Sequence, residues 1–209
     1  MFTGIIEEIG TVQAIDGPDL TIACKSVLNG VAIGDSIAID GACMTVVAFD
    51  DASFRVQVSP ESFDRTTLGT LREGHPVNLE CAMAAGDRFG GHFVLGHVDA
   101  VGSVAEVKPQ GDFQLWTFTA PHDVSKYLVP KGSITVDGIS LTVVNPHDDR
   151  FSVAVIPETL KKTKLHAKRP GDPVNLEADV FGKHILHYLQ NAMSGLSAET
   201  LLSRMSAAD

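Results

Sequence analysis

The chain has 209 residues, of which 16 are Lys or Arg and 26 are Asp or Glu, so its formal net charge is −10. Hydrophobic residues at 44% and charged residues at 20% provide enough apolar side chain for a packed core, which excludes a disordered or fibrous protein. The acidic balance repels a phosphate backbone and argues against nucleic-acid binding. The opening MFTGIIEEIG lacks the basic and apolar stretches of a signal peptide, and no run of roughly 18 apolar residues predicts a membrane span, so we expect a cytoplasmic protein without membrane contact.

The sequence contains an internal duplication. Shifted by 97 positions, residues 36–80 align without a gap onto residues 133–177, and 22 of the 45 aligned pairs are identical. A weaker match at a shift of 92 places residues 4–12 over residues 96–104. Two units of about 90 residues are within the usual range for domains and are too long for solenoid repeats. We therefore predict domains at 1–92 and 93–183 and a terminal segment at 184–209.

Within each copy, short runs rich in Val, Ile, Phe and Thr alternate with turn residues, as at 37–39, 45–49 and 54–58. About six such runs per copy, without an intervening amphipathic helix, predict an all-β fold, either an antiparallel barrel or a sandwich. Proline followed by helix-compatible residues predicts helical turns at 60–68 and 157–165, and we expect a third short helix at 122–129.

After the second copy, apolar residues recur every three or four positions, which predicts one apolar stripe on a helix. Such a stripe either packs on the chain's own domains or contacts another subunit. The pair Ser194-Gly195 predicts a break in the helix, with a short second helix at 198–205. The residues of the stripe are Phe181, Ile185, Tyr188, Leu189, Ala192 and Leu196.

The copies differ in reactive side chains at equivalent positions. Ser, His and Asp side chains in the second copy could act as nucleophile, proton carrier and orienting acid. Because the chain lacks a GxSxG elbow, a hydrolase is disfavoured, and Ser140 and Thr142 could instead be strand hydroxyls bonded to backbone. The second-copy residues Ser140, His97, Asp179 and Lys131 stand opposite Cys43, Ile5, Ala82 and Gly34, whereas the pairs Thr45 and Thr142 and Glu61 and Glu158 are the same.

The histidines and cysteines do not suggest a metal site. His92 and His97 are five residues apart, which on a strand places them on opposite faces, so a shared metal is not expected. The three cysteines are odd in number and lack CxxC spacing, which argues against zinc and disulfides and fits reduced thiols. Cys43 is either a nucleophile or a buried thiol, and Cys24 and Cys81 are expected to be buried.

The segments MFTGII, GACMTV, GGHFVLGHVD, KGSITVDGISLTV and IPETL, together with two copies of PVNLE, resemble the riboflavin synthase family, alpha-chain type, over essentially the whole chain. The resemblance implies two tandem six-stranded antiparallel Greek-key barrels and a C-terminal α-helix that assembles a homotrimer. It also implies the reaction, in which two molecules of 6,7-dimethyl-8-ribityllumazine exchange a four-carbon unit to give riboflavin and 5-amino-6-ribitylamino-2,4(1H,3H)-pyrimidinedione. No cofactor or metal takes part.

The resemblance further implies that each working site pairs the first barrel of one subunit with the second barrel of its neighbour. Each pocket would contain a leading segment, a strand and a strand-to-helix turn of its own copy. The first pocket would consist of Gly4, Ile5, Ile6, Cys43, Met44, Thr45, Gln57, Val58, Ser59, Pro60, Glu61 and Ser62. The second would consist of Gly96, His97, Val98, Ser140, Leu141, Thr142, Ala154, Val155, Ile156, Pro157, Glu158 and Thr159, with Lys131 reaching in from the other chain.

The same resemblance suggests roles in catalysis. We expect His97 to transfer a proton, Ser140 and Thr142 to bond the ring or supply a nucleophile, and Asp179 to orient or polarise that group. Cys43, opposite Ser140, is the catalytic candidate of the first copy. Leu95 stands where many family members carry Ser, beside His97. A lumazine carrier of the same fold is the alternative function, and an association with lumazine synthase is left open.

Overall fold

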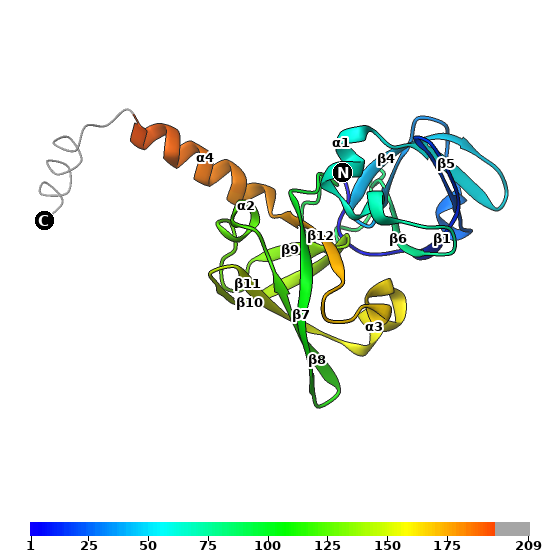
Figure 1. Ribbon diagram of the computed structural model, residues 1–209. Coiled ribbons are helices and arrows are strands. Elements are labelled where there is room, and N and C mark those ends of the chain that lie inside the picture. The colour runs from blue at the N-terminus through cyan, green and yellow to red at the C-terminus, as the bar shows by residue number, and fades with distance from the viewer. Residues whose placement is uncertain (195–209) are drawn as a thin grey trace, which may run out of the picture.

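The computed structural model describes residues 1–194, which form two closed β-barrels followed by a helix (Figure 1). Neighbouring strands follow the order β1-β2-β5-β4-β3-β6 in the first barrel, and the second repeats it as β7-β8-β11-β10-β9-β12. In each barrel three consecutive strands are linked as hairpins, β3-β4-β5 in the first and β9-β10-β11 in the second. The next strand, β6 or β12, returns to pair with the first of the three, which is the Greek-key arrangement. The prediction of two six-stranded antiparallel barrels with a C-terminal helix is confirmed.

The strands of the two barrels occupy equivalent positions in their copies. The first barrel contains β1 (Glu8–Asp16), β2 (Asp19–Ala23), β3 (Ser36–Ile39), β4 (Ala42–Phe49), β5 (Ser53–Gln57) and β6 (Pro76–Cys81). The second contains β7 (Ala100–Gln110), β8 (Phe113–Thr119), β9 (Ser133–Val136), β10 (Ile139–His147), β11 (Arg150–Val155) and β12 (Pro173–Ala178).

Each barrel has a hydrophobic core of its own, built by the alternation of side chains along its strands. In β5, for example, Phe54 and Val56 are buried whereas Arg55 and Gln57 are exposed. In the second barrel the ring of Phe118 stacks on that of Phe151, with 5.4 Å between their centroids. Burying one such apolar side chain contributes roughly 1.5–3 kcal/mol. The two cores are separate, but Ile6 of the first copy packs against the core of the second barrel, and Val98 of the second copy packs against the core of the first.

Short helices join the strands. The predicted helical turns at 60–68 and 157–165 are confirmed. The helix expected at 122–129 ends at Ser125, after which the N–H groups of Tyr127 and Leu128 bond to carbonyl oxygens three residues back instead of four. The helical elements are η1 (Ser26–Leu28), α1 (Pro60–Arg65), η2 (Thr67–Thr70), α2 (His122–Ser125), α3 (Pro157–Lys162) and η3 (Lys164–Ala167).

The terminal helix α4 (Val180–Ser194) projects away from the second barrel (Figure 1). Its first turn is held by the Phe181 ring, which packs edge-on against Phe93 at 5.3 Å between centroids, and by an ion pair of 2.6 Å between Lys183 Nζ and Asp99 Oδ2. The helix begins at Val180, one residue before the first residue of the predicted stripe, and the Asp179 carboxylate accepts the Phe181 N–H at 2.9 Å as an N-cap.

Most of the predicted stripe on α4 faces away from the chain's own barrels. Ile185 is 61% exposed, Tyr188 72% and Leu189 48%, so they do not pack on the chain's own barrels. Of the two alternatives, contact with another subunit stays a prediction. Leu196 and the short helix predicted at 198–205 lie outside the described residues. Within residues 1–194, no helix is long and apolar enough to cross a membrane.

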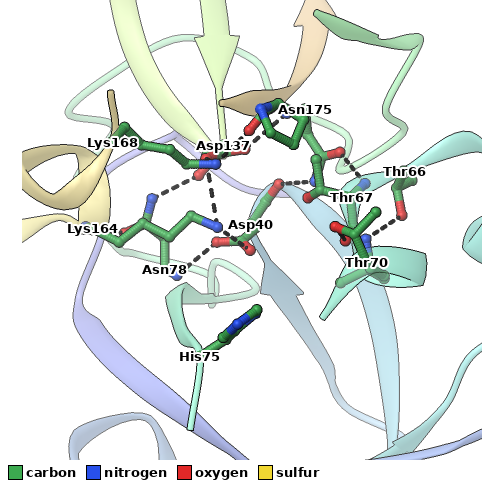
Figure 2. Close-up of polar contacts among 12 residues, drawn as sticks. Asp40, Thr66, Thr67, Thr70, His75, Asn78, Asp137, Lys164, Lys168 and Asn175 are labelled. Carbon is green, nitrogen blue, oxygen red and sulfur yellow. Dashed lines mark hydrogen bonds and ion pairs between the residues drawn. The ribbon is translucent and has the colours of Figure 1, made fainter. Parts of the chain in front are cut away.

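The barrels meet around a local twofold axis, where the β3–β4 turn faces the β9–β10 turn. Asn78 Nδ2 donates to the carbonyl oxygen of Asp137 at 2.9 Å, and its counterpart Asn175 Nδ2 donates to the carbonyl oxygen of Asp40 at 2.8 Å (Figure 2). Gly41 has a φ of +80°, and a Cβ added to it would lie 2.7 Å from the backbone nitrogen of Gly138. Close backbone approach at this point therefore requires glycine.

Replacing Gly41 by Ala is expected to lower the free energy of unfolding by at least ~2 kcal/mol, because the methyl group adds a clash between the barrels to the strain of a positive φ. Gly30→Ala is the matched control, since Gly30 has a φ of +79° and open space around the added Cβ. Urea unfolding of both variants measures the difference. Equal losses in the two variants would show that the barrels are not in close contact at Gly41.

Candidate active site

Each copy begins with a leading segment that is held by a buried glutamate of the same copy. The carboxylate of Glu80, at the end of β6, accepts the Thr3 N–H at 2.6 Å and the Gly4 N–H at 2.9 Å. The equivalent Glu177 accepts the Leu95 N–H at 2.9 Å and the Gly96 N–H at 3.0 Å. Burial raises the pKa of both carboxyl groups, while these hydrogen bonds act in the opposite direction. The last residue of each PVNLE segment therefore fixes a leading segment.

Each leading segment also contacts the barrel of the other copy. The carbonyl oxygen of Gly4 accepts the Ser140 N–H at 2.8 Å, and that of Gly96 accepts the Cys43 N–H at 2.9 Å. Gly4 and Gly96 have φ values of +78° and +77°, and an added Cβ would lie 2.6 Å from the Cβ of Ser140 or of Cys43. Only glycine allows this backbone conformation and approach.

This exchange corrects the predicted grouping of site residues. We expected Gly4, Ile5 and Ile6 beside Cys43, and Gly96, His97 and Val98 beside Ser140. Within one chain the structure places each segment at the other barrel. The physical reason is that the glutamate anchors each segment at the edge of its own barrel. There the next hydrogen-bonding partner is a backbone N–H at the start of β4 or β10 in the other copy, and we call the first residues of these two strands the strand heads. His97 is consequently part of the first barrel's pocket.

That pocket is a cavity of about 380 Å³, between the head of β4, helix α1 and the second leading segment. Its size is within the range of small-molecule sites. Arg65 lies at its rim in an ion pair with Glu61 at 3.2 Å, and Ser59 Oγ accepts the Ser62 N–H at 3.1 Å to begin α1. The lining residues are Ala42, Cys43, Met44, Glu61, Ser62, Arg65, Thr66, Gly96, His97 and Val98.

At the head of β10, the Ser140 hydroxyl lies 2.7 Å from Nδ1 of His92, so its partner is a side chain rather than backbone. His92 is 9% exposed, and burial lowers its pKa, with the nearby Asp179 acting in the opposite direction. A neutral imidazole can accept the hydroxyl proton and so activate an oxygen nucleophile. Sequence reasoning assigned His92 no role. The two glycines before it were the available signal, because they allow the backbone to approach Ser140 closely: a Cβ added to Gly91 would lie 3.1 Å from the Cβ of Ser140.

The remaining predicted site residues lie around these two strand heads. Thr45 and Thr142 are exposed on β4 and β10, and Lys131 is exposed in a left-handed backbone conformation with φ of +63°. Asp179 caps α4, as described above, and also acts electrostatically on His92. The remaining residues lie where β5 leads into α1 and where β11 leads into α3. Gln57, Ser59, Pro60, Ala154, Ile156, Pro157 and Glu158 are exposed, Thr159 is half-buried, and Val58 and Val155 are buried.

The cysteines are half-buried rather than fully buried. Burial raises the thiol pKa of Cys24 and of Cys81 to about 12, so both remain protonated and unreactive. Cys43 differs from them because it lines the first barrel's cavity. Among residues 1–194, no group of three or more His, Cys, Asp or Glu side chains is placed to hold a metal ion.

The sequence matches the lumazine binding domain family twice, at residues 3–82 and 95–179. Riboflavin synthase from Actinobacillus pleuropneumoniae is 46% identical over 193 residues, which is 90% of each chain. The chain belongs to the riboflavin synthase family. Another member, from Bacillus subtilis (strain 168), is 41% identical over 205 residues, covering 96% of this chain and 95% of the relative.

Solved structures show the same fold. LumP complexed with riboflavin matches with a TM-score of 0.79 at 22% identity, covering 85% of this chain and 99% of LumP. LumP complexed with 6,7-dimethyl-8-(1'-D-ribityl) lumazine matches with a TM-score of 0.75 over the same shares of the two chains, also at 22% identity. At this level of identity the likeness concerns the duplicated barrel architecture alone.

Replacing His92 by Gln is expected to lower the free energy of unfolding by about 1 kcal/mol at pH 7, through loss of the Ser140 contact. Because the pKa of His92 lies below its ordinary 6.5 in the folded chain, the unfolded chain gains a proton first and the wild type loses stability as the pH falls through 6.5. The variant lacks this loss. The difference in the free energy of unfolding between wild type and variant, measured by urea unfolding, should therefore become smaller from about pH 7.5 to pH 5.5. A difference that does not change with pH would show that the pKa of His92 is not lowered in the folded chain.

Proposed function

We propose that this chain is a riboflavin synthase, which converts two molecules of 6,7-dimethyl-8-ribityllumazine into riboflavin and 5-amino-6-ribitylamino-2,4(1H,3H)-pyrimidinedione. The observation that carries the proposal is a duplicated lumazine binding domain in a chain that matches riboflavin synthases over at least 90% of its length at 41% identity or more. A reaction between two identical molecules needs two related pockets that treat them differently. The two strand heads, with Cys43 in one and Ser140 in the other, support this requirement.

The reaction requires one lumazine to lose a proton from its acidic C7 methyl group and the other to accept a nucleophile at C7. Four carbon atoms then pass from the donor to the acceptor, and the donor leaves as the pyrimidinedione. Atoms and electrons balance between the two substrates and the two products, so no external oxidant enters. The protein has to hold both rings in register and move protons, which are the contributions of positioning and of acid–base catalysis.

We assign these tasks to the residues around the two strand heads. His97, exposed at the first barrel's cavity, is the proton carrier for the C7 methyl group. Ser140 is the candidate nucleophile, because its hydroxyl lies 2.7 Å from the buried His92. Thr142 binds the second ring from the same barrel, Lys131 reaches in from the other chain, and Asp179 acts on this group through His92.

We further propose that the working site forms between subunits of a homotrimer, from the first barrel of one and the second barrel of the next. The support is the apolar face of α4, which leaves Ile185, Tyr188 and Leu189 exposed on a helix that projects from the barrels. Burying large apolar side chains of this kind is the usual driving force of subunit association.

In a turnover assay, Ser140→Ala and His97→Gln are each expected to lower kcat by about 10²-fold or more, while lumazine binding changes little. Ser103→Ala is the matched control, since the Ser103 hydroxyl bonds only Thr119, at 2.7 Å, on the adjacent strand. The assay mixes the protein with 6,7-dimethyl-8-ribityllumazine and follows riboflavin absorbance. Wild-type protein that binds the pigment without converting it would be a carrier, and unchanged rates in both variants would remove the assigned roles.

Replacing Ile185 and Leu189 together by Glu is expected to dissociate the trimer into monomers and to abolish turnover, because the charges disrupt the apolar face of α4. Gln190→Glu on the same helix serves as the control for added charge. Sedimentation velocity gives the oligomeric state. A trimer that survives the double substitution would show that α4 does not assemble it.

A further inference from the structure

A cavity of about 470 Å³ lies between the barrels, on their local twofold axis and away from the strand heads described above. All ten residues that line it form equivalent pairs, related by the shift of 97 positions between the copies. The pairs are Thr67 and Lys164, Thr70 and Ala167, Leu71 and Lys168, His75 and Asp172, and Pro76 and Pro173. The cavity is therefore symmetric in position but not in chemistry.

The second copy contributes two ammonium groups where the first contributes Thr67 and Leu71. Figure 2 shows both lysines reaching toward Asp40 and Asp137 from one side, with Thr67 and Thr70 on the other. Lys164 Nζ lies 2.5 Å from Asp40 Oδ2, and Lys168 Nζ lies 3.3 Å from Asp137 Oδ2. Lys168 Nζ also donates to the carbonyl oxygen of Pro173, and Lys164 Nζ lies 3.5 Å from Asp137 Oδ2. Since an ammonium has three hydrogen atoms, two contacts leave one on each lysine for a further acceptor.

Neighbouring charged side chains are turned to backbone. Arg72 and Arg169 are equivalent residues, and their guanidinium groups each donate at 2.8 Å to the carbonyl oxygen of the preceding lining residue, Leu71 or Lys168. The Asp172 carboxylate accepts the Arg169 N–H at 2.7 Å. The cations that line the cavity are therefore the two lysines.

Two uncharged donors complete the lining. Thr67 is 4% exposed, and in the part of the chain that the structure describes its hydroxyl has no hydrogen-bond partner. A buried hydroxyl without a partner is costly, so such groups call for an explanation, of which a ligand is one. His75 accepts the Arg72 N–H at Nδ1, at 3.2 Å, so a neutral ring carries its hydrogen on Nε2 and can donate there.

We propose that this cavity binds a phosphate group, free or as the monoester of a small organic molecule. The phosphate oxygens accept from the Lys168 ammonium and the Thr67 hydroxyl, with His75 as a further donor. The cavity exceeds the size of a phosphate group alone, and Leu71, Pro76 and Pro173 offer apolar surface for an organic remainder. The site is independent of the lumazine reaction, since none of its residues lies at the head of β4 or β10.

The test is calorimetric titration of the full chain with inorganic phosphate and with ribose 5-phosphate, to about 10 mM, with ribose as the uncharged control at matched chloride. Lys168→Leu introduces the residue that the first copy has at this position, and Asp137 keeps Lys164 at 3.5 Å as a partner. Thr67→Val removes the unpartnered hydroxyl and keeps the size and shape of the side chain. Lys108→Leu, which loses a surface ion pair with Glu106, controls for the loss of one positive charge.

Saturable binding of a phosphate compound that weakens about tenfold or more in Lys168→Leu and in Thr67→Val, but not in Lys108→Leu, is the expected result. Thr67→Val should keep or raise the apo melting temperature, which separates a ligand role from a structural one. Tighter binding of ribose 5-phosphate than of phosphate identifies an ester as the ligand, and equal binding identifies free phosphate. The absence of binding to wild type, or unchanged affinity in both site variants, would overturn the proposal.

Discussion

Two buried carboxylates determine how this molecule is assembled. Glu80 and Glu177 each accept backbone N–H groups of a leading segment, and this fixes the segment at the edge of its own barrel. Hydrogen bonds from backbone to a charged acceptor are among the stronger ones in proteins, so the segments are held firmly. Once they are held, the carbonyl oxygens of Gly4 and Gly96 meet the strand heads of the opposite barrels. The first barrel's cavity is therefore lined by residues from both copies.

The duplication keeps this frame and varies the chemistry within it. Three kinds of residue occur in both copies: the asparagines that bridge the barrels, the two glutamates and the glycines of the leading segments. In each pair the two equivalent residues make equivalent contacts. The strand heads differ, with a thiol in one and a hydroxyl beside a buried imidazole in the other. Residues that position the backbone are the same in both copies, whereas Cys43 and Ser140 at the strand heads differ. A reaction that gives two identical molecules different roles requires this combination.

The sequence was sufficient to predict the elements that depend on local pattern. Alternating apolar residues such as Phe54 and Val56 predicted strands, and the periodic residues of α4 predicted a helix. The predicted stripe began at Phe181, and α4 begins one residue earlier, at Val180, after the Asp179 cap. The exchange of leading segments could not be predicted, because aligning Gly4 with Gly96 says that they are equivalent and nothing about which barrel each contacts. His92 escaped the comparison of the copies because it has no aligned position in the first copy at the shift of 92.

The crossed leading segments also bear on how a two-barrel chain of this kind arises. A single barrel with its own segment anchored at the edge would leave its strand head without the glycine carbonyl that caps it. Two separate, identical barrels would supply this group to each other, as in a domain-swapped dimer, and joining them in one chain makes the exchange permanent. Cutting the chain between residues 82 and 95 would therefore give two fragments that each need a partner barrel, either the other fragment or a second copy of itself.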